Sequence, residues 1–98
     1  MTQIERIRHY EKLLDRVALA ESEFENALEN FRAALEPMRE LDAYYGSEEW
    51  RQDLADDEAG KLPADLKRGV LSEDAAYDAV TDYRRLLAEM LYAAADAL

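Results

Sequence analysis

The densest set of chemically capable side chains is an acidic run at residues 48–58, which reads EEWRQDLADDE. Six of these positions carry carboxylates, and hard cations such as Ca²⁺ and Mg²⁺ prefer oxygen ligands of this kind. The spacing does not fit an EF-hand loop, because counting from Asp53 puts Glu58 at the sixth position, where that loop needs glycine. We therefore expect a solvated helix face. The alternative is a divalent-ion or enzymatic site made by four acidic residues: Asp53, Asp56, Asp57 and Glu73.

Other catalytic and metal-binding chemistry has few residues to use. His9 is the only histidine and there is no cysteine, so thiolate metal sites and thiol catalysis are excluded. A di-iron bundle needs a glutamate three residues before the histidine, and that position is Arg6. We expect no catalytic residue, no metal site and no cofactor, and hence a protein that is not an enzyme.

Three basic residues follow the acidic run, at Lys61, Lys67 and Arg68. They are candidates for a small anion site, because the helix start expected at Ser72 also favours negative charge. The bland explanation is compensation of a helix dipole, since Lys67 and Arg68 are expected in the last turn of a short helix. We predict no small-molecule ligand for the chain.

The composition is that of a small acidic folded protein. The 98 residues include 12 bases and 23 acids, for a formal net charge of −11, and 49% of them are hydrophobic. This length suits a single domain over residues 1–98 with a modest core. Nucleic acids and anionic membranes are disfavoured as partners, because binding them relies on Lys and Arg. With no signal-peptide pattern and no apolar run of spanning length, we expect a cytoplasmic protein.

Apolar residues recur in steps of three and four from Ile4 to Tyr45, apart from one gap of seven across Ala20 and Glu21. This pattern predicts one long amphipathic helix whose period, near 3.5, suits coiled-coil-like packing. Pro37 falls inside it, and because the apolar pattern continues in phase we favour a kink over a break. In the alternative, one helix ends near Leu35 and another starts at Pro37.

Glycine and serine set the next boundaries. Gly46 suits the left-handed conformation just past a helix end, and Ser47 suits the cap of a helix over residues 48–58. Tyr44, Tyr45 and Trp50 gather around this turn. Such residues either complete a small core or form a binding surface when exposed.

The segment KLPADLKRGVLSED, at residues 61–74, is predicted to be a short helix followed by a cap. Pro63 starts that helix, Gly69 stops it in a left-handed conformation, and Ser72 caps a final helix from about Glu73 to the end. The fold class is therefore all-α: a long N-terminal helix packs against a C-terminal helix as an antiparallel hairpin, with one or two short helices in the connection.

The apolar stripe between Ile4 and Leu35 is longer than a final helix of about 26 residues can cover, and an uncovered stripe usually marks a contact with another chain. Self-association is the simplest solution. In the alternative, the chain folds back at Pro37 into a compact monomer of three or four helices. The expected interface residues are Ile7, Leu14, Val17, Phe24, Leu28 and Phe31.

YYGSEEW together with DEAGKLPADLKRGVLSEDAAYD resembles a bacterial family known as domain of unknown function 4298. The resemblance covers nearly the whole chain and is most specific between Leu41 and Asp78. It implies a bacterial or phage origin and a small stand-alone protein, but no activity, substrate or cofactor. The matching residues are Tyr44, Tyr45, Gly46, Trp50, Leu62, Pro63, Lys67, Arg68, Gly69, Val70, Leu71, Ser72, Glu73, Asp74 and Tyr77.

The sequence thus supports three functional hypotheses. The first is a non-enzymatic module that binds a protein partner or a second copy of itself, for example as a homodimer. The second is an acidic decoy that resembles a nucleic-acid backbone and occupies a basic, nucleic-acid-binding protein. The third is the ion-binding or enzymatic site on the acidic run.

Overall fold

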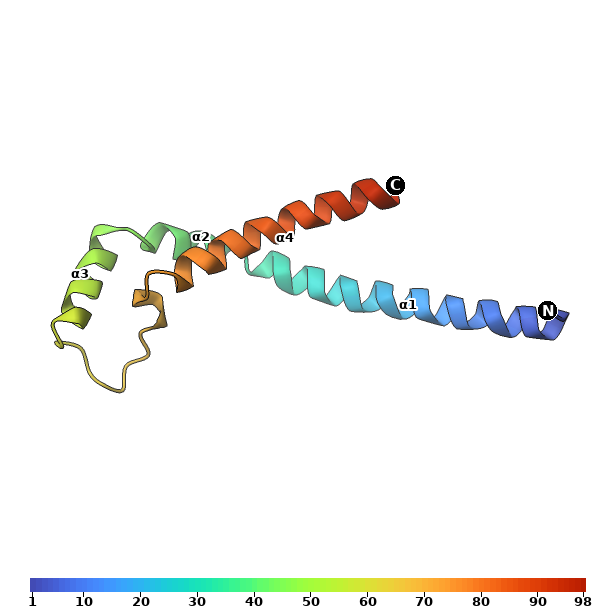
Figure 1. Ribbon diagram of the computed structural model, residues 1–98, viewed down its shortest axis with the longest axis horizontal. Coiled ribbons are helices and arrows are strands. Elements are labelled where there is room, and N and C mark those ends of the chain that lie inside the picture. Colours follow the sequence, from blue (N-terminus) through green and yellow to red (C-terminus); the bar gives the residue numbers. More distant parts are fainter. The chain divides into compact units, whose positions relative to one another are not determined.

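The computed structural model describes residues Met1–Leu98 and contains helices but no strands (Figure 1). The contacts divide the chain into two units, Met1–Leu35 and Glu36–Leu98, which are described separately. The elements in chain order are α1 (Gln3–Ala33), α2 (Leu35–Tyr44), α3 (Glu48–Glu58), the short 3-10 helix η1 (Gly69–Leu71) and α4 (Ala75–Ala97). The all-α class predicted from the sequence is confirmed.

The first unit is essentially the single helix α1. Its 31 residues contain no glycine or proline and extend over roughly 46 Å at 1.5 Å per residue. The Thr2 hydroxyl oxygen accepts a hydrogen bond from the Glu5 backbone N–H at 3.1 Å, which satisfies one of the free donors at the helix start. No residue of α1 is buried.

One non-helical residue, Ala34, separates α1 from α2. Pro37 is the third residue of α2 and has no N–H to donate to the carbonyl of Ala33, and its ring would clash with that carbonyl in an uninterrupted helix. At the end of α1 the Ala34 N–H bonds to the carbonyl of Phe31, three residues earlier, at 3.1 Å. This bond tightens the last turn of α1. The predicted kink near Pro37 is confirmed, and its centre lies three residues before the proline.

In the second unit, α2 and α4 run in opposite directions. Asp42 pairs with Arg84 at 3.0 Å, whereas Tyr45, three residues later, donates its hydroxyl to the Glu73 carbonyl at 3.1 Å. Contacts that advance along α2 therefore move back along α4, as Figure 1 also shows. This confirms the helical hairpin between the end of the kinked helix and the C-terminal helix.

The core of the second unit is small. Its buried side chains are Leu71 from η1 and Ala76, Val80 and Tyr83 from the first half of α4. The three α4 residues are spaced by four and three, so they form one face of that helix, and Leu71 adds to it from η1. The second half of that helix has no buried residue.

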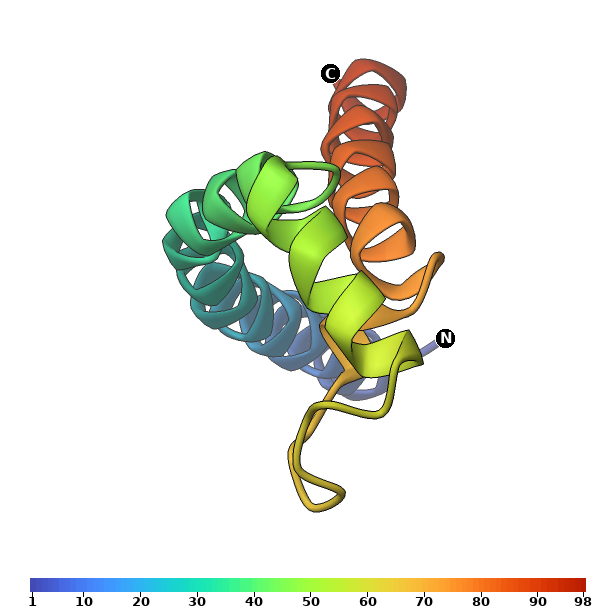
Figure 2. The same cartoon turned by 90° about the vertical axis from the view of Figure 1, so that its left-hand side faces the viewer.

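The helix α3 begins and ends as its sequence predicts. The Ser47 hydroxyl oxygen accepts from the Trp50 backbone N–H at 3.1 Å, and the preceding turn uses Gly46 with φ of +80°. Gly60 follows the helix end with φ of +72°. Both glycines occupy the left-handed region that other residues enter only with strain. Figure 2 shows α3 toward the viewer, with the loop that follows it extending beyond its end.

The predicted short helix starting at Pro63 is wrong. Residues 61–68 form an irregular segment with one turn, in which the Leu66 N–H bonds to the Pro63 carbonyl at 3.2 Å. A helix of six residues gains too few hydrogen bonds to offset its nucleation cost. Gly69 does not stop a helix either. It begins η1 and has no positive φ, so its predicted left-handed conformation is also wrong.

Ser72 makes the bond expected of a cap, although α4 begins at Ala75 rather than at Glu73. Its hydroxyl oxygen accepts from the Ala75 N–H at 3.2 Å and its hydroxyl donates to the Gly69 carbonyl at 2.9 Å. One side chain thus joins the end of η1 to the start of α4.

Candidate interaction surface

The apolar residues of α1 follow a heptad pattern, with alternating steps of three and four residues along one side of the helix. Glu21 occupies the one place in this row that is not apolar. We call the row the α1 seam: Ile7, Tyr10, Leu14, Val17, Glu21, Phe24, Leu28 and Phe31. All six interface residues predicted from the sequence belong to it.

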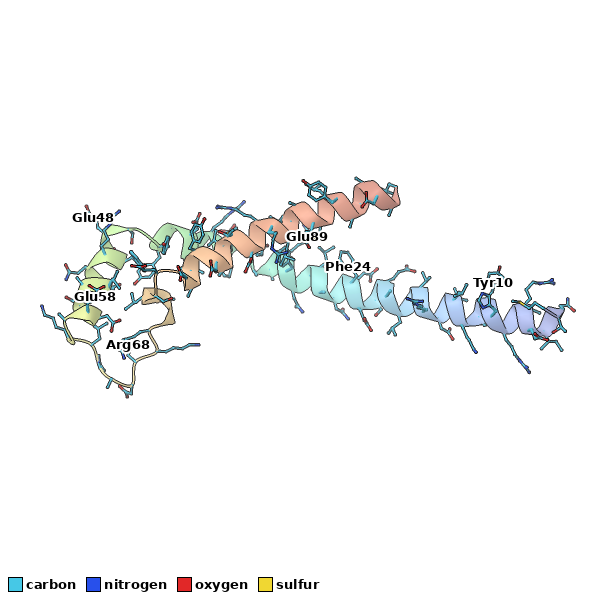
Figure 3. All side chains as sticks on the ribbon, viewed as in Figure 1. Tyr10, Phe24, Glu48, Glu58, Arg68 and Glu89 are labelled. Carbon is cyan, nitrogen blue, oxygen red and sulfur yellow. The ribbon has the colours of Figure 1, made fainter.

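Most of the α1 seam is exposed. The exposed fractions are 54% for Ile7, 61% for Leu14 and 54% for Phe24, and Tyr10 and Val17 are similar. Leu28 and Phe31, near the end of α1, are half-buried. Figure 3 shows that Tyr10 and Phe24 project from the same side of the helix. This exposed apolar row is the candidate interaction surface of the chain.

The acidic run lies on α3, and three of its six carboxylates have partners within the second unit. Asp53 accepts a hydrogen bond from the Tyr44 hydroxyl at 2.6 Å, and Asp57 pairs with Arg68 at 2.6 Å. Asp56 accepts from the Gln52 amide at 2.9 Å. These bonds hold α2 and the 61–68 segment against α3. No group of three or more histidine or acidic side chains is placed to hold a metal ion.

The bond between Tyr44 and Asp53 changes the acidity of the phenol. The Asp53 carboxylate accepts a hydrogen bond from the neutral phenol and opposes a second negative charge beside it, and partial burial of Tyr44 acts in the same direction. Together they raise the pKa of Tyr44 from 10.0 to about 12. Tyr44 is therefore a neutral donor at physiological pH, and its role here is to join α2 to α3.

The three basic residues proposed as an anion site have different surroundings. Arg68 is paired with Asp57, and the Lys61 ammonium lies 4.0 Å from an Asp56 oxygen. Lys67 lines a shallow, mostly apolar cavity of about 360 Å³. Two of the three positive charges are thus compensated by different carboxylates of α3. From the sequence, Lys67 and Arg68 are predicted to lie at a helix end. In the structure Arg68 instead makes a tertiary ion pair with Asp57.

Aromatic side chains brace η1 and the start of α4. The Trp50 indole N–H donates to the Val70 carbonyl at 2.9 Å, and its ring lies 4.9 Å from that of Tyr45, centroid to centroid. Tyr45 also contacts the ring of Tyr77 at 6.5 Å. Between the two roles left open by the sequence, these contacts place Tyr45 and Trp50 in structural packing. The sequence contains no signal for the bond from Trp50 to Val70, which joins segments 20 residues apart.

Comparison with known proteins gives one match. The family described as Domain of unknown function (DUF4298) matches residues 7–93, which include the whole α1 seam and most of α4. No curated protein and no solved structure matches the chain. None of its helices combines the length and apolar character needed to cross a membrane.

Proposed function

The chain belongs to the DUF4298 family, and we propose that it is a non-enzymatic interaction module that associates with a second copy of itself. The observation that carries the proposal is the exposed α1 seam on a helix without a single buried residue. Bacterial origin and a cytoplasmic location, both expected from the sequence, are part of this proposal.

The chain itself is too short to cover the α1 seam. From Ile7 to Phe31 the seam extends over roughly 36 Å, at 1.5 Å per residue. The part of α4 beyond its last buried residue, Tyr83, ends at Ala97 and extends over roughly 21 Å. Whatever the arrangement of the two units, this half of α4 leaves roughly 15 Å of the seam in water. A second α1 helix has the matching length and the matching apolar row.

The second unit supports an interaction role rather than a catalytic one. Two of its carboxylates join separate elements: Asp53 bonds to Tyr44 of α2 and Asp57 pairs with Arg68 of the 61–68 segment. Tyr45 and Trp50 donate to backbone carbonyls. We infer that the second unit is a folded, structural part of the chain that holds the ends of its helices in position.

The decoy hypothesis is the second candidate, and the net charge of −11 favours it. A decoy binds a basic protein with an affinity that falls steeply as salt screens the charges. Association through an apolar seam changes little with salt, because hydrophobic burial does not depend on charge. Pull-down with an immobilised basic protein over a salt series separates the two functions.

Concentration-dependent hydrogen–deuterium exchange locates the proposed interface. Amides in α1 are expected to exchange more slowly as the protein concentration rises, because pairing suppresses local opening of the helix. Amides around the core residues Leu71, Val80 and Tyr83 serve as the internal control, and their exchange is expected to stay constant. Protection of α1 that does not change with concentration would refute self-association through the seam.

A further inference from the structure

We propose that two copies of α1 pair in antiparallel orientation about a twofold axis, which passes between the helices at the level of Leu19. This inference rests on the proposed self-association and adds its geometry. The seam of one chain is covered by the seam of a second copy. The antiparallel direction of the pair follows from two features of α1: the position of Glu21 and the distribution of charge along the helix.

Glu21 is the first reason. It occupies a seam position, so in a parallel, in-register pair it would face Glu21 of the second copy across the interface. Two carboxylates would then meet in a partly desolvated layer, where like charges repel strongly. In an antiparallel pair centred near Leu19, Glu21 instead lies opposite Val17 of the second copy, so the two Glu21 carboxylates are offset by roughly 6 Å along the axis, at 1.5 Å per residue. A single polar residue in an apolar seam is a known determinant of helix orientation and register.

The charge along α1 is the second reason. Residues 1–17 carry four bases and three acids, whereas residues 18–31 carry four acids and no base. Parallel pairing would place the two acidic halves side by side. Antiparallel pairing places each acidic half against the weakly basic half of the second copy, which lowers repulsion and favours encounter in this direction. The acids of the second half are Glu21, Glu23, Glu25 and Glu29.

The centre of the seam suits close approach. The midpoint between Ile7 and Phe31 is residue 19, and the residues that flank the seam there are the small Ala18 and Ala20. With this centre, every apolar seam residue of one helix lies within the seam of the other. A twofold arrangement also limits the assembly to two chains, because the seam of each copy is covered by the seam of the other.

Distance measurement between spin labels tests the orientation. The chain has no cysteine, so a single introduced cysteine gives one label per chain. Glu5→Cys and Leu19→Cys are matched sites, because they lie two heptads apart on the side of α1 opposite the seam. In the antiparallel dimer the two labels at position 19 are at the same height, whereas those at position 5 are displaced along the axis by roughly 40 Å, at 1.5 Å per residue.

The outcomes separate the orientation from the proposed function. A distance between labels at position 5 that exceeds that at position 19 by roughly 20 Å or more supports antiparallel pairing. Equal distances at both sites in a dimeric protein overturn the orientation and leave self-association through α1 intact. Dimers without a defined distance at either site overturn the use of α1 itself. A monomer by sedimentation overturns the proposed function and this inference together.

Discussion

Replacing Phe24 by aspartate tests the α1 seam at an exposed aromatic residue. Phe24 is 54% exposed in the single chain, so about half of its side chain remains to be buried by a partner. Full burial of such a side chain gives ~1.5–3 kcal/mol, and half of it gives ~1 kcal/mol per copy. Desolvating the introduced carboxylate costs a further ~1–3 kcal/mol per copy. Counted twice in a twofold dimer, the loss is about 4–8 kcal/mol.

This loss corresponds to a dimer dissociation constant weakened by roughly 10³- to 10⁶-fold. Sedimentation equilibrium measures that constant, and a circular dichroism melt at low protein concentration reports the fold of the separate chain, which is expected to change little. The matched control is Leu19→Asp. Leu19 is 61% exposed and also lies on α1, but on the side opposite the seam. Its change to aspartate carries a loss of helix propensity at least as large as that of Phe24→Asp, so it controls for this effect.

The control is expected to leave the dissociation constant within about threefold of the unmodified protein, because exposed surface changes usually stay within ~0.5 kcal/mol. Equal weakening by both substitutions would indicate a general effect on the helix. No weakening by Phe24→Asp would refute the seam as the contact surface.

Three further predictions concern the second unit. Raising the pH from 10 to 12 is expected to lower the stability of this unit. The pKa of Tyr44 beside Asp53 is about 12 in the folded state, against an ordinary value of 10.0, so the unfolded state loses the phenolic proton first. Tyr44→Phe should remove this part of the pH dependence in urea melts, and an unchanged slope would contradict the assignment. Gly60→Ala is expected to lower the free energy of unfolding by ~1 kcal/mol or more, since φ is +72° at this position. Gly69→Ala should be tolerated, and similar melting temperatures for the two variants would contradict that contrast. Ser72→Ala should cost about 1 kcal/mol through its bond to the start of α4, and thermal unfolding with no loss would show that the bond is not needed.

Local signals allowed much of the fold to be predicted from the sequence. The boundaries of α3 follow from Ser47 and the glycines at 46 and 60, because caps and left-handed turns depend on residues only a few positions apart. The kink near Pro37 follows equally from one missing N–H and one steric clash. The seam of α1 was predictable for the same reason, since a heptad pattern is a property of consecutive residues.

Tertiary pairing was outside the reach of these signals. The order of charges in residues 63–68 is that of a helix with a compensated dipole, but Arg68 instead pairs with Asp57, which is 11 residues away. The bond between Tyr44 and Asp53 and that between Trp50 and Val70 also join separate elements. Nothing in the residues themselves indicates which donor meets which acceptor once the chain has folded.

The most direct test of the central claim, that the α1 seam is covered by a second copy of the chain, is the solution mass of the unmodified protein. Sedimentation equilibrium should be recorded over a wide range of protein concentrations, at low and high salt. We expect the mass to rise from that of one chain, 11.3 kDa, to twice that value, and to do so at both salt levels because burial of the seam drives the association. A mass that stays at 11.3 kDa at every concentration and salt level would contradict the claim.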